Sequence, residues 1–188
     1  STELAAFEDL GIIGGGSANN PENEIEILKS RKIIGKVVDT LNLNLSYFVE
    51  GRIKHNELYE SIPFKLEFIS NDYLRERDTT FIISIKDADH FDFLNEDFEV
   101  VKRGKFEEVN YSDIGRYKLL RNTEVIESYL NKNIIVHLRN RDKVIDNYKN
   151  RVDVSLIDKN SSVLNLSLID SKKKKAVAFL DELVHQYN

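Results

Sequence analysis

The chain has 188 residues, of which 41% are hydrophobic and 31% are charged, and this composition is typical of one globular domain rather than a disordered segment. Its formal net charge of −5 argues against a nucleic-acid-binding protein, because such proteins usually carry a basic face. The absence of cysteine excludes disulfides, thiolate metal sites and cysteine catalysis.

No stretch approaches the roughly 18 consecutive apolar residues that a membrane-spanning helix needs. The sequence also lacks a signal peptide and contains no methionine at all. We therefore expect it to be a soluble piece of a longer protein, whose other parts would carry any membrane anchor or catalytic domain.

Residues 1–20 are predicted to form an N-terminal segment followed by a flexible glycine-rich linker, since residues 11–20 read GIIGGGSANN. The run from Gly14 to Ser17 does not fit a phosphate-binding loop. That motif needs a Lys and a Ser or Thr at its end, where a helix begins, and no Lys follows here. We therefore predict no nucleotide site in this segment.

A single amphipathic helix is predicted over about residues 21–41. Asn20 is a suitable N-cap, and Pro21 stands at the first helical position, where its missing N–H costs nothing. Acidic residues come first and basic residues later, as the helix dipole favours. The predicted apolar stripe consists of Ile27, Ile34, Val38 and Leu41, widened by Ile33 and Val37.

The pattern then changes to the two-residue period of strands. Strands are predicted at 45–49, from Pro63 onward, at 81–85, within 91–101 and 104–120, and at 134–138, 152–156 and 164–168. A short helix is predicted at 141–149, and a closing helix from about Lys172 with the stripe Ala176, Leu180, Leu183 and Tyr187. This order predicts an α+β fold in which a largely antiparallel sheet is packed by an N-terminal and a C-terminal helix.

The sequence contains no complete catalytic or metal-binding motif of a familiar kind. The acidic segment from Asp87 to Asp92 lacks the Gly and Glu of a calcium-binding EF-hand loop, so we interpret it as a turn between strands. There is no G-x-S-x-G motif. The histidines have no partner at metal-ligand spacing; they are His55, His90, His137 and His185. We predict no catalytic residue, no metal and no cofactor.

Four consecutive lysines, Lys172, Lys173, Lys174 and Lys175, break a local rule, because they oppose the dipole at the start of the closing helix. One interpretation is a solvated helix start whose lysine stems cover apolar neighbours. The other is contact with an anionic membrane surface, where each basic residue contributes about 1 kcal/mol.

Several motifs, in the same order along most of the chain, resemble one protein family. They are EIEILKSR from Glu24, followed by Val-Val, Leu-Asn-Leu and Tyr-x-x-x-Gly; Leu-Tyr before Pro63; SSVL-x-L from Ser161; and Lys-Lys-Ala, FLDEL and Tyr-Asn in the closing helix. They are similar to motifs of the chain-length determinant (Wzz-type) polysaccharide co-polymerases, which include membrane tyrosine autokinases of exopolysaccharide export. The resemblance is strongest at both ends and thin over residues 70–130.

The resemblance implies that residues 21–188 are a periplasmic α+β base domain at the bacterial inner membrane. In that family such domains form homo-oligomeric rings that help to set polysaccharide length, together with the polymerisation and export machinery. The resemblance implies no enzymatic activity for this chain, although the parent of such a domain can be a protein-tyrosine kinase. As a fragment, the chain is expected to be a monomer.

The resemblance also suggests that Glu24, Glu26, Lys29 and Arg31 contact neighbouring protomers, while an ordinary charged surface explains them equally well. A second hypothesis is a saccharide-sensing module that regulates a cytoplasmic tyrosine kinase. Its candidate stacking residues are Tyr47, Phe48, Tyr73, Tyr111 and Tyr117; tryptophan, the best stacking surface, is absent. A third hypothesis, a free-standing soluble enzyme, would require an unrecognised pair of acidic residues in a cleft.

Overall fold

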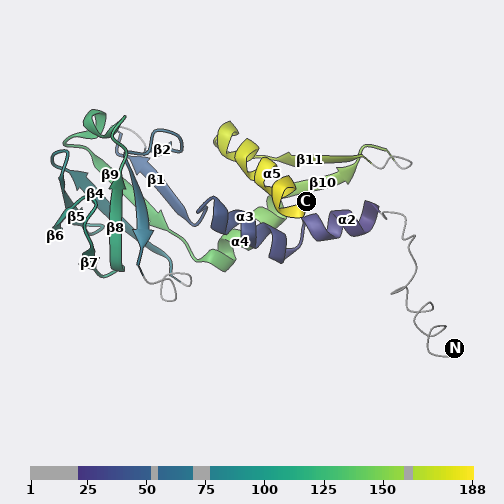
Figure 1. Cartoon of the computed structure of the whole chain (residues 1–188), viewed down its shortest axis with the longest axis horizontal. Helices are drawn as coiled ribbons and strands as arrows, with labels where there is room; N and C mark the ends of the chain where they lie inside the picture. Colours follow the sequence, from purple (N-terminus) through teal and green to yellow (C-terminus); the bar gives the residue numbers. More distant parts are fainter. Residues whose placement is uncertain (1–20, 52–54, 70–76, 159–162) are drawn as a thin grey trace, which may run out of the picture.

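The computed structural model describes residues 21–51, 55–69, 77–158 and 163–188. Within them the chain has an α+β fold, with an N-terminal and a C-terminal helical segment and only antiparallel strand pairs, which confirms the predicted fold class. The elements form two modules, a strand-rich one and a helical one, which lie side by side along the long axis of the molecule (Figure 1). The predictions for residues 1–20, including the cap at Asn20, and for Tyr73 lie outside the described residues.

The β module comprises residues 45–138 and contains two sheets. One sheet has six strands in the order β2-β1-β9-β4-β5-β6, and the other has three strands in the order β3-β8-β7. The elements are β1 (Leu45–Val49), β2 (Asn56–Leu58), β3 (Phe64–Phe68), β4 (Thr79–Ile85), β5 (His90–Leu94), β6 (Val100–Lys105), β7 (Asn110–Ser112), β8 (Gly115–Arg121), a 3₁₀ helix at Ile126–Tyr129 and β9 (Asn133–Leu138).

The two sheets pack face to face through an aromatic core. Phe81 of β4 stacks on Phe93 of β5 with ring centroids 5.0 Å apart, and Tyr117 of the smaller sheet lies 5.9 Å from Phe93. Tyr47 and Phe64 meet edge to face at 5.8 Å. Large rings at alternate strand positions therefore fill the space between the sheets, as the two-residue period predicts.

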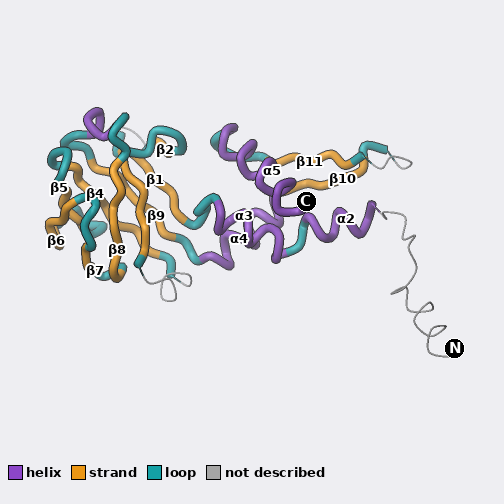
Figure 2. Tube along the Cα trace, in the orientation of Figure 1, coloured by secondary structure: helices purple, strands orange, loops and turns teal. Residues whose placement is uncertain are grey.

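The helical module, residues 21–43 and 140–188, is built from both ends of the chain (Figure 2). Its helices pack against one another and against a hairpin, so that their inward faces form a second core with Leu28, Val38 and Phe179 at its centre. The elements are α2 (Pro21–Leu28), α3 (Arg31–Thr40), α4 (Arg141–Arg151), β10 (Val152–Leu156), β11 (Leu164–Leu168) and α5 (Lys173–Tyr187). The predicted base domain, residues 21–188, thus contains two large cores in its described part, and a small cluster of Ile82, Leu94 and Ile135 lies on the six-stranded sheet.

The chain crosses between the modules twice, and the crossings lie next to each other. The first crossing connects α3 to β1, and the second connects β9 to α4. β1 pairs with β9, and beyond this ladder the Arg139 N–H donates to the Asn44 carbonyl at 2.8 Å. Beside this bond the Arg141 guanidinium donates two hydrogen bonds to the Asp39 carboxylate of α3, at 2.6 and 2.7 Å. Two parallel N–H···O bonds of this kind give strong and directional pairing.

The predicted single helix over residues 21–41 is wrong in one respect, because it is broken at Ser30. Ser30 has extended backbone angles (φ −68°, ψ 144°), and its hydroxyl accepts from the Ile33 N–H at 3.3 Å. It therefore caps a new helix, α3, instead of continuing α2. The break also removes Ile27 from the stripe. Ile27 is 49% exposed, whereas its neighbour Leu28 is buried.

Two details of the C-terminal part also differ from expectation. α4 continues to Arg151, two residues beyond the predicted end. In α5 the buried stripe runs through Ala176, Phe179 and Leu183, while Tyr187 is 37% exposed. Phe179, and not the predicted Leu180, is fully buried in this stripe. Its ring stacks on Tyr148 of α4, with ring centroids 4.6 Å apart. No helix among the described residues is both long and apolar enough to span a membrane.

Replacing Ser30 with Ala should lower the free energy of unfolding by about 1 kcal/mol, because the first turn of α3 loses its capping acceptor. Urea denaturation followed by circular dichroism measures this change. Ser30→Asp is the matched control, since its carboxylate also caps the Ile33 N–H and favours the positive end of the helix. Equal destabilisation by both variants would show that the cap contributes nothing.

Candidate functional site

A groove of about 570 Å³ opens at the boundary between the two modules. It lies between the end of α3, strands β1, β2 and β3, the end of β8 and the start of α5. Its floor is largely apolar and includes Leu43, Tyr47, Leu58 and Phe64. A cavity of this size, with apolar walls and a few polar groups, has the general properties of a small-molecule site.

A buried ion pair forms one wall of the groove and joins the two modules. The Lys175 Nζ of α5 lies 2.8 Å from Glu57 Oε1 of β2, and the two side chains are only 11% and 13% exposed. The Ser171 hydroxyl donates to the other Glu57 oxygen at 3.0 Å. At the surface nearby, Lys174 pairs with Glu60 at 2.6 Å. We call Lys175–Glu57 and Lys174–Glu60 the junction pairs.

A second buried carboxylate supports the start of α5 from behind. Asp170 accepts from Arg151 at 2.8 Å and from the Lys172 N–H at 3.1 Å. Burial opposes the ionisation of Asp170, but these hydrogen bonds and the nearby Lys175 hold its pKa below the usual value. Arg151 in turn lies over the Tyr148 ring at 5.2 Å, so the carboxylate, the guanidinium and the aromatic core are joined in one chain of contacts.

Tyr59 is the half-buried aromatic residue of the groove. Burial raises the pKa of its phenol, Lys175 lowers it, and Asp170 and Glu60 raise it further. The phenol therefore stays protonated at neutral pH. A protonated phenol offers a ring face together with a hydrogen-bond donor and acceptor, which is the combination that saccharides use.

Four of the five aromatic residues that the saccharide-sensing hypothesis named lie in the part of the chain that the structure describes. Tyr47 and Tyr117 lie in the core of the β module, where burial raises each pKa to about 12. Phe48 packs on His137 with ring centroids 4.7 Å apart. Tyr111 is 52% exposed, with Lys102 and Arg116 each 5.6 Å from its ring centre. Of these residues only Tyr47 lines the groove, as part of its floor.

The lysine run is explained in part by the junction pairs. Lys174 and Lys175 compensate for their unfavourable place at the helix start by pairing with acidic residues of β2 and the segment after it. Lys173 is exposed and Lys172 half-buried. Contact of the lysine run with an anionic membrane stays a prediction, but Lys175 is 9% exposed and is already held by Glu57.

The four charged residues proposed for protomer contacts differ in their surroundings. Glu26 is exposed, while Glu24 and Lys29 are half-buried. Arg31 forms ion pairs with Asp142 and Asp146 of α4, so it joins α3 to α4 within the chain. Contacts of these four residues with a second protomer stay a prediction, and Glu26 is the residue most free to make one.

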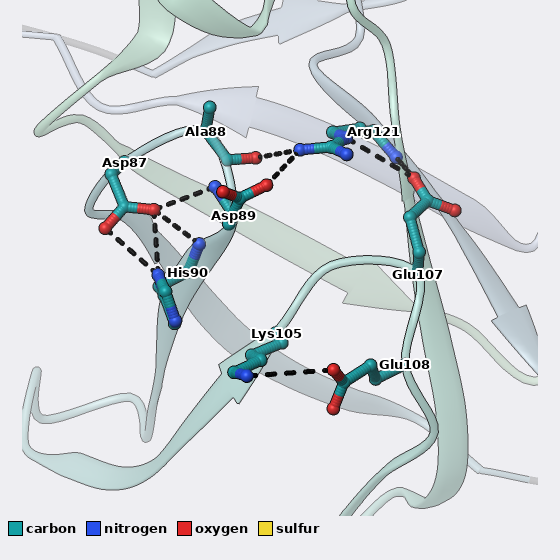
Figure 3. A network of polar contacts seen from close by, with 8 residues as sticks. All are labelled: Asp87, Ala88, Asp89, His90, Lys105, Glu107, Glu108 and Arg121. Carbon is teal, nitrogen blue, oxygen red and sulfur yellow. Dashed lines mark hydrogen bonds and ion pairs between the residues drawn. The ribbon is translucent and has the colours of Figure 1, made fainter.

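Within the acidic segment, residues 87–89 form a turn between β4 and β5, as interpreted from the sequence, while residues 90–92 belong to β5. Asp87 accepts from the backbone N–H groups of Asp89 and His90, at 2.8 and 2.7 Å, and contacts the His90 ring at 3.0 Å (Figure 3). These bonds lower the pKa of Asp87. Across the turn, Arg121 of β8 contacts Asp89, the Ala88 carbonyl and Glu107 (Figure 3). The network ties the turn to the smaller sheet.

In the part of the chain that the structure describes, no group of three or more His, Asp or Glu side chains could hold a metal ion. Sequence reasoning missed Glu57, Tyr59 and Glu60 as site residues. The lysine run was the available signal, because cations at a helix start require nearby carboxylates. It could not identify which of 32 acidic residues supply them.

Comparisons with known proteins give no relative. No model of a protein family matches the chain, and a search of curated proteins finds no match.

Replacing Glu57 with Gln should lower the free energy of unfolding by about 2–3 kcal/mol, because it leaves the Lys175 ammonium buried without a counter-charge. Urea denaturation measures the change. Glu60→Gln is the matched control, since the exposed Lys174–Glu60 pair should contribute below about 0.5 kcal/mol. The double variant Glu57→Gln/Lys175→Met should recover most of the loss. If Glu57→Gln cost no more than Glu60→Gln, the Lys175–Glu57 pair would not be a structural tie.

Proposed function

We propose that the chain is a periplasmic scaffold domain of a bacterial inner-membrane polysaccharide co-polymerase. It would assemble with further copies in its parent protein and take part in the control of polysaccharide length and export. It would have no enzymatic activity itself, and the parent would be a membrane protein, in some members a tyrosine kinase.

The observation that carries this proposal is where the family-like motifs lie. The EIEILKSR motif from Glu24 lies in α2 and at the start of α3. The SSVL-x-L motif ends in β11, and the FLDEL motif lies in α5. Although more than 100 residues separate the first motif from the other two, their apolar residues share one core. The motifs thus describe one structural unit, which is what inheritance of a common domain would produce.

The arrangement of the helical module adds support. α2 and α5, the first and last described helices, pack in this module (Figure 1). A domain that is joined to the membrane through both of its ends needs those ends on one module. The β module, which contains the stretch where the resemblance is thin, would then project away from the membrane.

The proposal is tested in the parent protein with Glu26→Arg. Glu26 is exposed, so the reversal of charge should leave the fold intact but weaken contacts between copies. We expect smaller assemblies in size-exclusion chromatography and a changed distribution of polysaccharide lengths on gels. Glu96→Arg, an equal change on an exposed turn of the β module, is the control and should leave both unchanged.

Two results would contradict the proposal. One is a Glu26→Arg parent with unaltered assembly size and polymer length. The other is a reading frame without an apolar span of roughly 20 residues on each side of this segment, because the family's base domain lies between two membrane helices.

The groove favours the saccharide-sensing alternative, with Tyr59 in place of the residues first named. If it holds a saccharide, export-pathway oligosaccharides should shift the amide resonances of residues 57–60, and Tyr59→Ala should abolish those shifts. The matched control is Tyr111→Ala, which removes an exposed ring outside the groove. The absence of any shift at saturating oligosaccharide would eliminate this alternative.

A further inference from the structure

A second cavity, of about 520 Å³, lies beside the groove at the same boundary. The two share Leu43, Ser46 and Lys175 among their lining residues. The second cavity differs in character because half of its lining residues are charged, namely Asp78 before β4, Arg139 after β9, Lys143 and Arg151 of α4, and Lys175 of α5.

One face of α4 supplies a row of hydrogen-bond donors to this cavity. Lys143, Asn147 and Arg151 follow each other at intervals of four residues, so they project from the same side of the helix. The row is fixed at its start, where the Asn140 side chain accepts from the Lys143 N–H at 3.1 Å. It is fixed at its end by the contact of Arg151 with Asp170.

The lining of the cavity is strongly basic, although the chain as a whole carries a net charge of −5. Arg139, Lys143, Arg151 and Lys175 face it, and Asp78 is the one carboxylate of its lining among the residues that the structure describes. Focusing of field lines in a cleft with one sign of charge favours ligands of the opposite sign.

Carboxylates orient three of these cations. Asp78, which belongs to the lining, lies 2.5 Å from Lys143. Arg151 pairs with Asp170, and Lys175 pairs with Glu57; neither of these two carboxylates belongs to the lining. The charges of Arg151 and Lys175 are therefore held at the wall with their counter-ions behind them.

Arg139 is different, since it forms no ion pair with any residue that the structure describes. Its charge also acts on a neighbouring side chain. The pKa of His137, two residues earlier on β9, is lowered by burial and then by Arg139 and His55. An unpaired guanidinium with a fixed fork of donors is the group best suited to a bidentate oxyanion.

From this geometry we propose that the cavity binds an oxyanion, a carboxylate or phosphate carried on a ligand of about monosaccharide size. Arg139 and Lys143 hold the anionic group, and Asn147 and the Ser46 hydroxyl contact the rest of the ligand. Cavities of about 300–1,000 Å³ accept ligands of this class. The ligand would contact both modules, since Ser46 belongs to β1, Lys143 and Asn147 belong to α4, and Arg139 lies in the crossing between β9 and α4. This inference does not depend on the proposed polysaccharide function.

The test is a titration of the full isotope-labelled chain, observed by the backbone amide resonances. Pyrophosphate and glucuronate are the two probes, and glucose is the neutral control. We expect saturable shifts at Ser46 and at residues 139–151 with at least one probe and none with glucose. Tighter binding of pyrophosphate would assign a phosphate ligand, and tighter binding of glucuronate would assign an acidic sugar.

Arg139→Gln and Lys143→Gln should each weaken the better probe about tenfold, because each removes a charge-assisted hydrogen bond. Lys149→Gln is the matched control. It removes the same charge from an exposed position of α4 outside the cavity, and its affinity should stay within about twofold of the unmodified chain. The amide spectra of the variants show whether each remains folded.

Three results would overturn the proposal: neither probe saturates, the shifts map away from the residues that line the cavity, or Lys149→Gln weakens binding as much as Arg139→Gln. The last would indicate attraction to a basic surface rather than a site.

Discussion

Five residues of β1 pair in register with β9, from Leu45 opposite Leu138 to Val49 opposite Ile134, and this ladder brings the two chain crossings together. Because the ladder ends at the boundary, α3 and α4 begin their contact directly beyond it, with Arg141 on Asp39. The helical module depends on this placement, since its core needs helices from both ends of the chain. A slip of one residue in the ladder would turn Tyr47 and Val136 out of the core and also move α4 along α3.

The boundary between the modules is stabilised in a different way from their interiors. Each interior is an apolar core, but across the boundary the ties are ionic, and both junction pairs reach from α5 to β2 and the segment that follows it. Ionic ties need exact partners and tolerate little apolar repacking, so they fix orientation more than they add stability. They also leave space beside them, and this is where the groove and the basic cavity are found.

Much of the fold could be predicted because strand periodicity is a local signal. β11 follows this period, with half-buried leucines alternating with the exposed Asn165 and Ser167, whereas β4 is buried on both faces from Phe81 to Ile85. The break at Ser30 was missed, since a serine within an apolar period is compatible with both a helix interior and a cap. The sequence also could not show that Phe179 rather than Leu180 is buried in the core, because Phe179 stacks on Tyr148, which lies 31 positions earlier in the chain.

The candidate sites were harder to predict than the fold because they consist of pairings across long separations. Glu57 and Lys175 are 118 residues apart, and nothing near either residue specifies the other. Arg139 and Lys143 stand close in sequence, but their shared cavity exists only because β9 ends where α4 begins. Sequence patterns report periodicity and capping, whereas partners of this kind are set by topology.

Because the chain crosses between the modules twice, the two parts of the helical module are synthesised on either side of the β module. Residues 45–138 are continuous, so the β module has all of its strands once β9 has left the ribosome. α2 and α3 are synthesised before the β module, yet their apolar faces have no complete core until Phe179 and Leu183 of α5 follow it. During that interval α2 and α3 expose apolar surface, and α5 is the helix that later covers it.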